Sequence, residues 1–167
     1  MKLAIATLAA AFVVAPAALA QGNLELGAAY SNVDTDGANL DALTARATYF
    51  VNPYVGVEGE ASIGIGDDTV GGANVELDHA IGAFGVLKAP VSDRVDVFAR
   101  LGYADSEYNV DVPGLGSGSG DTDGVAYGAG AKVFLTERFG LRGDLTRYEG
   151  DDGADADVIS VGGVMKF

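Results

Sequence analysis

The sequence contains no cysteine and no tryptophan, and His79 is the single histidine among its 167 residues. The absence of cysteine excludes disulfides, thiolate metal sites and cysteine nucleophiles. One histidine also excludes any site that needs two. Basic residues are scarce, because 10 Lys and Arg stand against 24 Asp and Glu, which gives a formal charge of −14. We therefore expect no nucleic-acid partner, since nucleic-acid binders neutralise phosphates with basic side chains. We also expect no cofactor.

Long hydrophobic runs are missing beyond the first twenty residues. The apolar run 80–87 has eight residues, whereas a membrane-spanning helix needs about twenty. Residues 1–20 differ from the rest, with a basic start at Lys2, an apolar stretch at 3–14, and Ala18 and Ala20 at the spacing that signal peptidase cuts. These features predict a signal peptide over 1–20 and one mature domain over 21–167. An uncleaved N-terminal membrane anchor is the alternative.

The remaining sequence alternates apolar and polar residues with a period of two, which indicates β-strands. The connections between the alternating segments are short at 52–53, 89–93 and 136–138, and long at 34–41, 66–72, 105–123 and 149–155. This order places the long loops at one end of an up-and-down meander. The alternating segments are 23–33, 42–51, 54–65, 73–88, 94–104, 124–135, 139–148 and 156–167.

The two faces of these strands differ in composition. One face carries Val, Leu, Ile and Ala, with Arg147 as its one charged residue and His79 as its one further ionisable group. The other mixes acids and bases with many glycines, which favours an internal lattice of ion pairs across a narrow lumen. The apolar face then contacts lipid. The charged residues of the predicted lumen are Glu25, Arg46, Glu58, Glu60, Glu76, Asp78, Asp96, Arg100, Lys132, Arg142, Asp144 and Lys166.

The sequence therefore predicts an all-β protein, an eight-stranded antiparallel up-and-down transmembrane β-barrel. A soluble periplasmic carrier barrel, which would enclose an apolar cavity, is the alternative fold assignment. Aromatic residues support the membrane interpretation, because interfacial girdles of aromatics flank the apolar band of such barrels. We expect one girdle at Tyr49, Phe139 and Phe167 and a second at Tyr30, Tyr103 and Tyr127. Inside the lumen, near the short turns, we expect a plug of Phe50, Phe84, Phe98, Phe134 and Tyr54.

Acidic residues gather in the long loops and at their rims, and no Lys or Arg occurs in any of the long loops. Such a surface attracts divalent cations or basic partner surfaces. Within 32–37, Asp34 and Asp36 follow the spacing of the first half of a calcium loop, but the bidentate Glu of the twelfth position is replaced by Leu43. The alternative to specific calcium binding is a solvated acidic surface with turn-forming Asp-Gly pairs. We assign no metal site.

Catalysis is a competing interpretation that centres on His79. On the predicted parity this histidine faces lipid near the outer interface, where a lipid headgroup could reach it. Barrel deacylases have a serine two residues after the histidine, and here that position is Ile81. We therefore expect no catalytic residues and no enzyme activity. A lipid-modifying outer-membrane enzyme remains an alternative function, as does a small gated ion-conducting pore, although eight strands leave an interior filled by side chains.

The C-terminal residues 160–167 resemble the C-terminal signal of bacterial outer-membrane β-barrels, with Ser160, Gly162, Met165 and Phe167 at its characteristic places. Together with residues 77–85, 98–103 and 141–148, they give the chain a resemblance to the small OmpA-like and opacity-protein-like barrel family. The resemblance implies insertion by the outer-membrane assembly machinery, short periplasmic turns and long surface loops. Because no peptidoglycan-binding domain follows, we do not expect cell-wall tethering.

Taken together, these features predict an integral protein of the cell outer membrane that is exported through the inner membrane. We expect it to contact outer-membrane lipids and lipopolysaccharide. Its expected role is non-enzymatic, either structural or in surface interactions through acidic extracellular loops.

Overall fold

The computed structural model describes residues 23–35, 38–70, 73–112, 116–150 and 155–167, and these form one sheet of antiparallel strands. The described part of the chain contains no helix that could span a membrane. The expected signal peptide, with Ala18 and Ala20, and the calcium-loop residue Asp36 lie outside the described residues. The strands are β1 Leu24–Thr35, β2 Ala38–Phe50, β3 Val55–Gly64, β4 Asp67–Val70, β5 Ala73–Ser92, β6 Val95–Val112, β7 Gly116–Phe134, β8 Phe139–Gly150 and β9 Asp155–Lys166.

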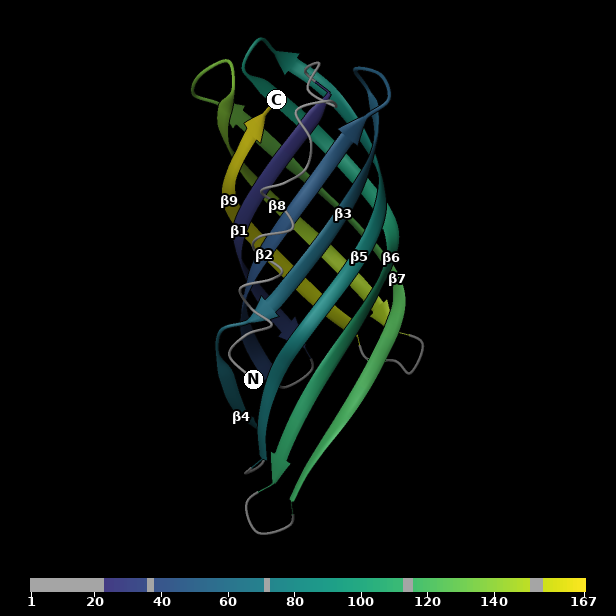
Figure 1. The fold of residues 1–167 in the computed structure, drawn as a ribbon, viewed down its shortest axis with the longest axis vertical. Coiled ribbons are helices and arrows are strands. Elements are labelled where there is room, and N and C mark those ends of the chain that lie inside the picture. The colour runs from purple at the N-terminus through teal and green to yellow at the C-terminus, as the bar shows by residue number, and fades with distance from the viewer. Residues whose placement is uncertain (1–22, 36–37, 71–72, 113–115, 151–154) are drawn as a thin grey trace.

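The sheet closes on itself as an eight-stranded barrel, as the sequence predicted. Neighbouring strands follow the order β3-β2-β1-β9-β8-β7-β6-β5-β4, and β3 also pairs with β5. Because β3 and β4 both pair with β5 and only residues 65–66 separate them, they form two parts of one barrel strand. Figure 1 shows the short connections and the C-terminus at one end, hereafter the turn end, and the paired hairpins at the other, hereafter the hairpin end.

Burial along each strand is inverted relative to a soluble protein, in which apolar residues are buried and charges face water. Lys132 is 0% exposed while the next residue, Val133, is 45% exposed, and Ser160 is 1% exposed beside Val161 at 62%. Only lipid surroundings make an exposed aliphatic face favourable over the full height of the strands. The charged face therefore lines the lumen and the aliphatic face forms the outer surface.

The segments predicted as long loops are largely strand, and this prediction was wrong. β6 and β7 remain paired up to Val112 and Gly116, and β1 and β2 up to Thr35 and Ala38. Once register is set, backbone hydrogen bonds extend a ladder through polar and glycine-rich sequence that offers no hydrophobic period to detect. As a result β5, β6 and β7 are the longest strands, and they extend past β1, β2, β8 and β9 at the hairpin end (Figure 1).

A β-bulge in β5 corrects the predicted position of Asp78. Leu77 pairs with Tyr108 and His79 with Glu107, so the intervening Asp78 has no partner residue on β6. The extra residue shifts the alternation by one: Leu77 is 4% exposed, whereas the Asp78 side chain is 54% exposed. Asp78 therefore lies on the outer surface and is not part of the lumen. The side chain of Glu76 lies outside the described residues.

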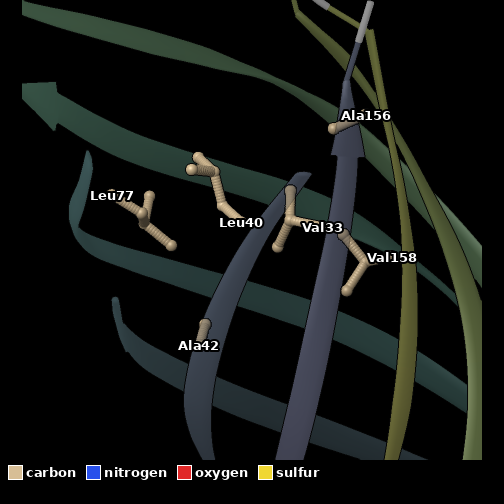
Figure 2. Close-up of a cluster of buried hydrophobic side chains, with 6 residues drawn as sticks. All are labelled: Val33, Leu40, Ala42, Leu77, Ala156 and Val158. Atoms are coloured by element: carbon tan, nitrogen blue, oxygen red, sulfur yellow. The ribbon is translucent and has the colours of Figure 1, made fainter. Parts of the chain in front are cut away.

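An apolar cluster fills the lumen at the hairpin end (Figure 2). Tyr108 and Tyr148 pack against it. The sequence analysis assigned Leu40 of this cluster to a loop, because the hairpin strands that carry it were not recognised. The cluster consists of Val33, Leu40, Ala42, Leu77, Ala156 and Val158.

Candidate functional site

The middle of the lumen holds a cluster of buried ion pairs, hereafter the central cluster. Glu58 accepts from two arginines, with Oε2 2.5 Å from Arg142 Nη1 and Oε1 2.9 Å from Arg100 Nη1. Arg46 Nε lies 2.5 Å from Glu60 Oε2, and its Nη1 lies 3.2 Å from Asp144 Oδ1. Three positive and three negative groups cancel formally. The members of the central cluster are Arg46, Arg100, Arg142, Glu58, Glu60 and Asp144.

A second group of charges, hereafter the lower cluster, lies nearer the turn end. Lys132 donates to Glu25, and Lys88 Nζ lies 3.5 Å from Glu25 Oε1. Asp96 lies 3.9 Å from Lys88 and 3.7 Å from the Lys166 ammonium. The sequence analysis did not include Lys88 in the lumen, although its even position in the segment 73–88 shares the parity of the other lumen residues.

Phenylalanines of the predicted plug pack against these cations. The Lys166 ammonium lies 3.4 Å from the centre of the Phe134 ring, and the Arg142 guanidinium 4.3 Å from that of Phe98. Cation–π contacts of this kind strengthen where water is excluded. Tyr54 does not join them, because it is 59% exposed. Its predicted place in the plug was wrong, since it lies in the connection between β2 and β3. The further contacts are Lys88 and Lys132 on Phe50, Arg100 on Phe84 and Lys132 on Phe98.

Hydroxyl side chains form a belt between the central cluster and the apolar cluster. Ser31 hydrogen-bonds Thr44 and Ser160, both at 2.8 Å, and Thr44 lies 2.9 Å from Ser62. Arg46 Nη2 donates to Ser160 Oγ at 3.0 Å and so connects the belt to the ion pairs. Sequence reasoning missed this belt, although all four residues carry lumen parity.

A small cavity of about 60 Å³ lies beside the hydroxyl belt. Its lining includes Ser31, Thr44, Glu60 and Tyr148, together with Thr122, whose buried Oγ1 has no hydrogen-bond partner in the protein. A polar cavity of this size has room for a few water molecules. It is too small for a substrate or for a wide diffusion path.

Three outward tyrosines near the hairpin end each donate to a carboxylate on the neighbouring strand. Each carboxylate lies two positions closer to the hairpin end than the residue that is paired with the tyrosine. Tyr30 donates to Asp41, Tyr103 to Asp123, and Tyr127 to Glu149 at 2.8 Å. The Tyr30 hydroxyl holds the pKa of Asp41 below its usual range, and hydrogen bonding from Asn32 acts in the same direction. These pairs, hereafter the tyrosine–carboxylate row, combine the upper predicted girdle with the lower edge of the acidic rim.

The remaining predicted residues lie on the outer surface or at the seam between β1 and β9. Asp34 is exposed on β1. Arg147 pairs with Asp155 at 2.8 Å and with Asp157 at 2.9 Å. His79 is half exposed, with Nδ1 3.6 Å from Asp78 Oδ2 and Nε2 3.7 Å from Glu107 Oε2. Sequence reasoning did not find this group, because the bulge that turns Asp78 outward leaves no signal in the period of two.

The residues of the C-terminal signal divide between the two faces of β9. Ser160 belongs to the hydroxyl belt, whereas Met165 and Phe167 are each 41% exposed on the outer surface. At Gly162 a Cβ atom would lie 2.0 Å from the Ala28 carbonyl oxygen and 2.5 Å from the Ala29 Cα. Only glycine permits that approach of β1 to β9, where the barrel closes.

Comparisons with known proteins agree with this architecture. The chain is similar to the outer membrane protein OprG of Pseudomonas aeruginosa, with a TM-score of 0.68 and 13% identity over 87% of this chain and 96% of that one. The N-terminal β-barrel domain of OprF, also from Pseudomonas aeruginosa, gives a TM-score of 0.66 and 14% identity over 88% and 98%. Ail, the attachment invasion locus protein of Yersinia pestis, gives a TM-score of 0.62 and 18% identity over 87% of this chain and 97% of that one.

At these identities the solved structures establish the fold alone, and no curated protein matches the chain. The model of the outer membrane protein β-barrel domain family matches residues 3–167. The inverted burial and the closed ladder of strands agree with that match. The match also places the protein in the outer membrane. The chain belongs to the outer membrane protein β-barrel domain family.

Proposed function

We propose that this barrel is a non-enzymatic surface protein whose acidic hairpins bind cationic partners outside the cell. The charge distribution at the hairpin end carries the proposal. Among the described side chains there, the basic groups are Arg147, which already pairs with acids, and His79. The acidic ones are Asp34, Asp41, Asp78, Asp105, Glu107, Asp121, Asp123, Glu149, Asp155 and Asp157. Such a surface draws cations and basic protein surfaces toward it and repels polyanions.

The lumen supports a structural role for the barrel and argues against a pore. The central cluster is neutral as a whole and occupies the middle of the lumen, and the apolar cluster fills the lumen beyond it. The cavity between them has room for a few water molecules only. Ions that crossed this lumen would have to displace paired buried charges, which is costly.

One solved relative invites comparison of ligand charge. Ail of Yersinia pestis has been solved in complex with the heparin analogue sucrose octasulfate, which is a polyanion. The hairpin end of the present barrel carries the same sign of charge as such a ligand. We therefore propose that this barrel binds polycations and does not bind sulfated polysaccharides.

Binding of a decalysine peptide and of heparin to the barrel in lipid nanodiscs tests the proposal. We expect decalysine to bind at 50 mM NaCl, to dissociate at 500 mM because salt screens exposed charges, and heparin not to bind. Combining Asp105→Asn with Asp121→Asn should weaken decalysine binding several-fold. The matched control, Asp93→Asn with Glu137→Gln, removes exposed acids at the turn end and should leave binding unchanged. Equal weakening by both sets, or binding of heparin, would refute the proposal.

We also infer that residues 1–20 are removed on export and that Ser160, Gly162 and Met165 of β9, together with Phe167 directly after it, direct insertion by the assembly machinery. The basic and apolar pattern of 1–20 supports the first inference. The position of β9 beside β1 supports the second, because β9 closes the barrel. Mass spectrometry of the mature protein should give Gln21 as its first residue. Deleting Phe167 should reduce the amount of protein in the outer membrane without changing its synthesis.

A further inference from the structure

We propose that Asp78, His79 and Glu107 form a binding site for one zinc ion on the outer surface of the barrel, at the hairpin end. Each residue offers one ligand atom, and these atoms all lie within 4.8 Å of one another. The site differs from the diffuse attraction of cations proposed above, because it needs a nitrogen ligand and a defined arrangement of three side chains.

The backbone brings the three residues together. His79 and Glu107 are directly opposed on β5 and β6, and the bulge turns Asp78 to the outer face beside His79. Without the extra residue, neighbouring positions on β5 would point to opposite faces. Bulges are common next to functional sites, where they redirect a side chain. The bulge therefore supplies the one ligand that a regular strand could not place here.

The separations suit a shared metal ion after rotation of the side chains. His79 Nδ1 lies 3.6 Å from Asp78 Oδ2, and Nε2, on the other side of the ring, lies 3.7 Å from Glu107 Oε2, so one carboxylate must turn toward the nitrogen that binds the ion. Two ligands at about 2.1 Å from zinc in tetrahedral geometry are about 3.4 Å apart. All three side chains are between two-fifths and a little over half exposed. They are therefore free to adjust their rotamers, and water can complete the coordination.

The ligand set selects the class of metal. One imidazole nitrogen with two carboxylates suits zinc, whereas calcium and magnesium take oxygen ligands. The nearby carboxylates of Asp105 and Asp121, which lie on the outward parity of β6 and β7, raise the local concentration of cations. No Lys or Arg occurs between residues 47 and 87 or between 101 and 131 to compete with the ion.

The site lies at the hairpin-end edge of the apolar band, where His79 is opposed by the apolar Ile63 on β3 and by Glu107 on β6. His79 is four residues beyond Ala83, which pairs with Tyr103 of the tyrosine–carboxylate row. At about 3.3 Å per residue this amounts to about 13 Å along the tilted strand. The exposed carboxylates of Asp78, Asp105, Glu107 and Asp121 surround this position, and they place a bound ion on the water side of that edge.

The single histidine makes the test direct, because its imidazole gives one set of NMR signals. The barrel, treated with a chelator and held in nanodiscs, is titrated with zinc chloride while calorimetry and the His79 imidazole signals are recorded. We expect one zinc per chain and a shift of the His79 signals. We expect at least tenfold weaker binding in each of His79→Ala, Asp78→Asn and Glu107→Gln, and no comparable shift with calcium.

The control variants Asp34→Asn and Asp93→Asn each remove one exposed carboxylate that is not a ligand, and zinc affinity should change little. Deleting Asp78 removes the bulge and should abolish zinc binding. The barrel should still remain folded in dodecyl sulfate when the sample is not heated. The proposal is overturned if His79 signals do not respond to zinc, or if the controls weaken binding as much as the ligand variants. Decalysine binding by His79→Ala should be unchanged, which separates this site from the proposed function of the hairpins.

Discussion

Lys132 is a fully buried ammonium in the lumen, and its surroundings show how the barrel tolerates charge in its interior. It donates to Glu25 and lies 5.1 Å and 5.2 Å from the ring centres of Phe98 and Phe50. A buried charge with no partner would be strongly unfavourable. The carboxylate neutralises the ammonium, and the rings replace part of the hydration that it loses.

Replacing Lys132 with methionine should lower the free energy of unfolding by about 3–5 kcal/mol, because removal of one partner leaves a buried charge poorly compensated. Among the described residues, Glu25 would retain the ion pair with Lys88, at 3.5 Å. The measurement is urea unfolding in lipid vesicles followed by circular dichroism, because the chain has no tryptophan for fluorescence. The double variant with Glu25→Gln should regain most of the loss, and Arg147→Met, at an exposed ion pair, should change stability much less. Equal losses in the single and double variants would contradict this account of Lys132.

Alternation in the sequence identifies the face of a residue where the period of two is unbroken. Arg46, Glu58 and Arg142 lie on strands of regular alternation, and the structure buries them in the lumen. Sequence reasoning failed for Asp78, because one extra residue in β5 reverses the alternation and nothing in the residue types marks the bulge. The zinc ligands were missed for the same reason, since they meet only once β5 and β6 are aligned.

At the scale of the strand, register decides which side of the barrel a residue faces. Alternation predicted the central parts of the strands. It did not predict the ends of β6 and β7, which stay paired up to Val112 and Gly116. Their sequence is rich in Gly, Ser and Asp, and a solvated hairpin requires no apolar face. Backbone hydrogen bonds hold this extended hairpin together, and the side chains show no period of two from which it could be predicted.

Replacing Gly162 with valine should impair closure of the barrel. A Cβ atom there meets backbone atoms of Ala28 and Ala29 at 2.0 Å and 2.5 Å, so β1 and β9 would have to separate. The fraction of folded protein, measured by gel mobility without heating, should fall strongly. Gly59→Val is the matched control, because a Cβ at Gly59 has no atom within 4 Å and points toward lipid. An unchanged folded fraction in Gly162→Val would show that the seam accommodates a side chain.

Shortening the β6–β7 hairpin should leave the barrel intact. Asp105 and Asp123 are paired residues, so replacing 106–122 with Asn-Gly gives a two-residue turn that fits the register. We expect normal folding in lipid vesicles and loss of zinc binding, because Glu107 is removed. Deleting Leu101 alone should instead prevent folding, since it shifts the register and places charged residues against lipid. Failure of the shortened barrel to fold would show that the extension is needed for assembly.

At the scale of the whole molecule, the closed ladder leaves no free sheet edge within the barrel. We therefore expect the protein in the outer-membrane fraction, and we expect unheated samples in dodecyl sulfate to migrate differently from boiled ones. Fractionation of expressing cells followed by electrophoresis measures both. Recovery in the soluble fraction with no mobility change would contradict the lipid-facing assignment of the aliphatic surface.

The central cluster constrains how the barrel can enter the membrane. Its charges come from β2, β3, β6 and β8, and Arg46 reaches Asp144 from 98 residues away in the sequence. A β1–β2 hairpin that inserted by itself would expose the Arg46 guanidinium to hydrocarbon without its two carboxylate partners, which is costly in a bilayer. The lumen charges are matched only when early and late strands meet. Insertion and closure should therefore be one cooperative event, in which partly inserted forms are too unfavourable to accumulate.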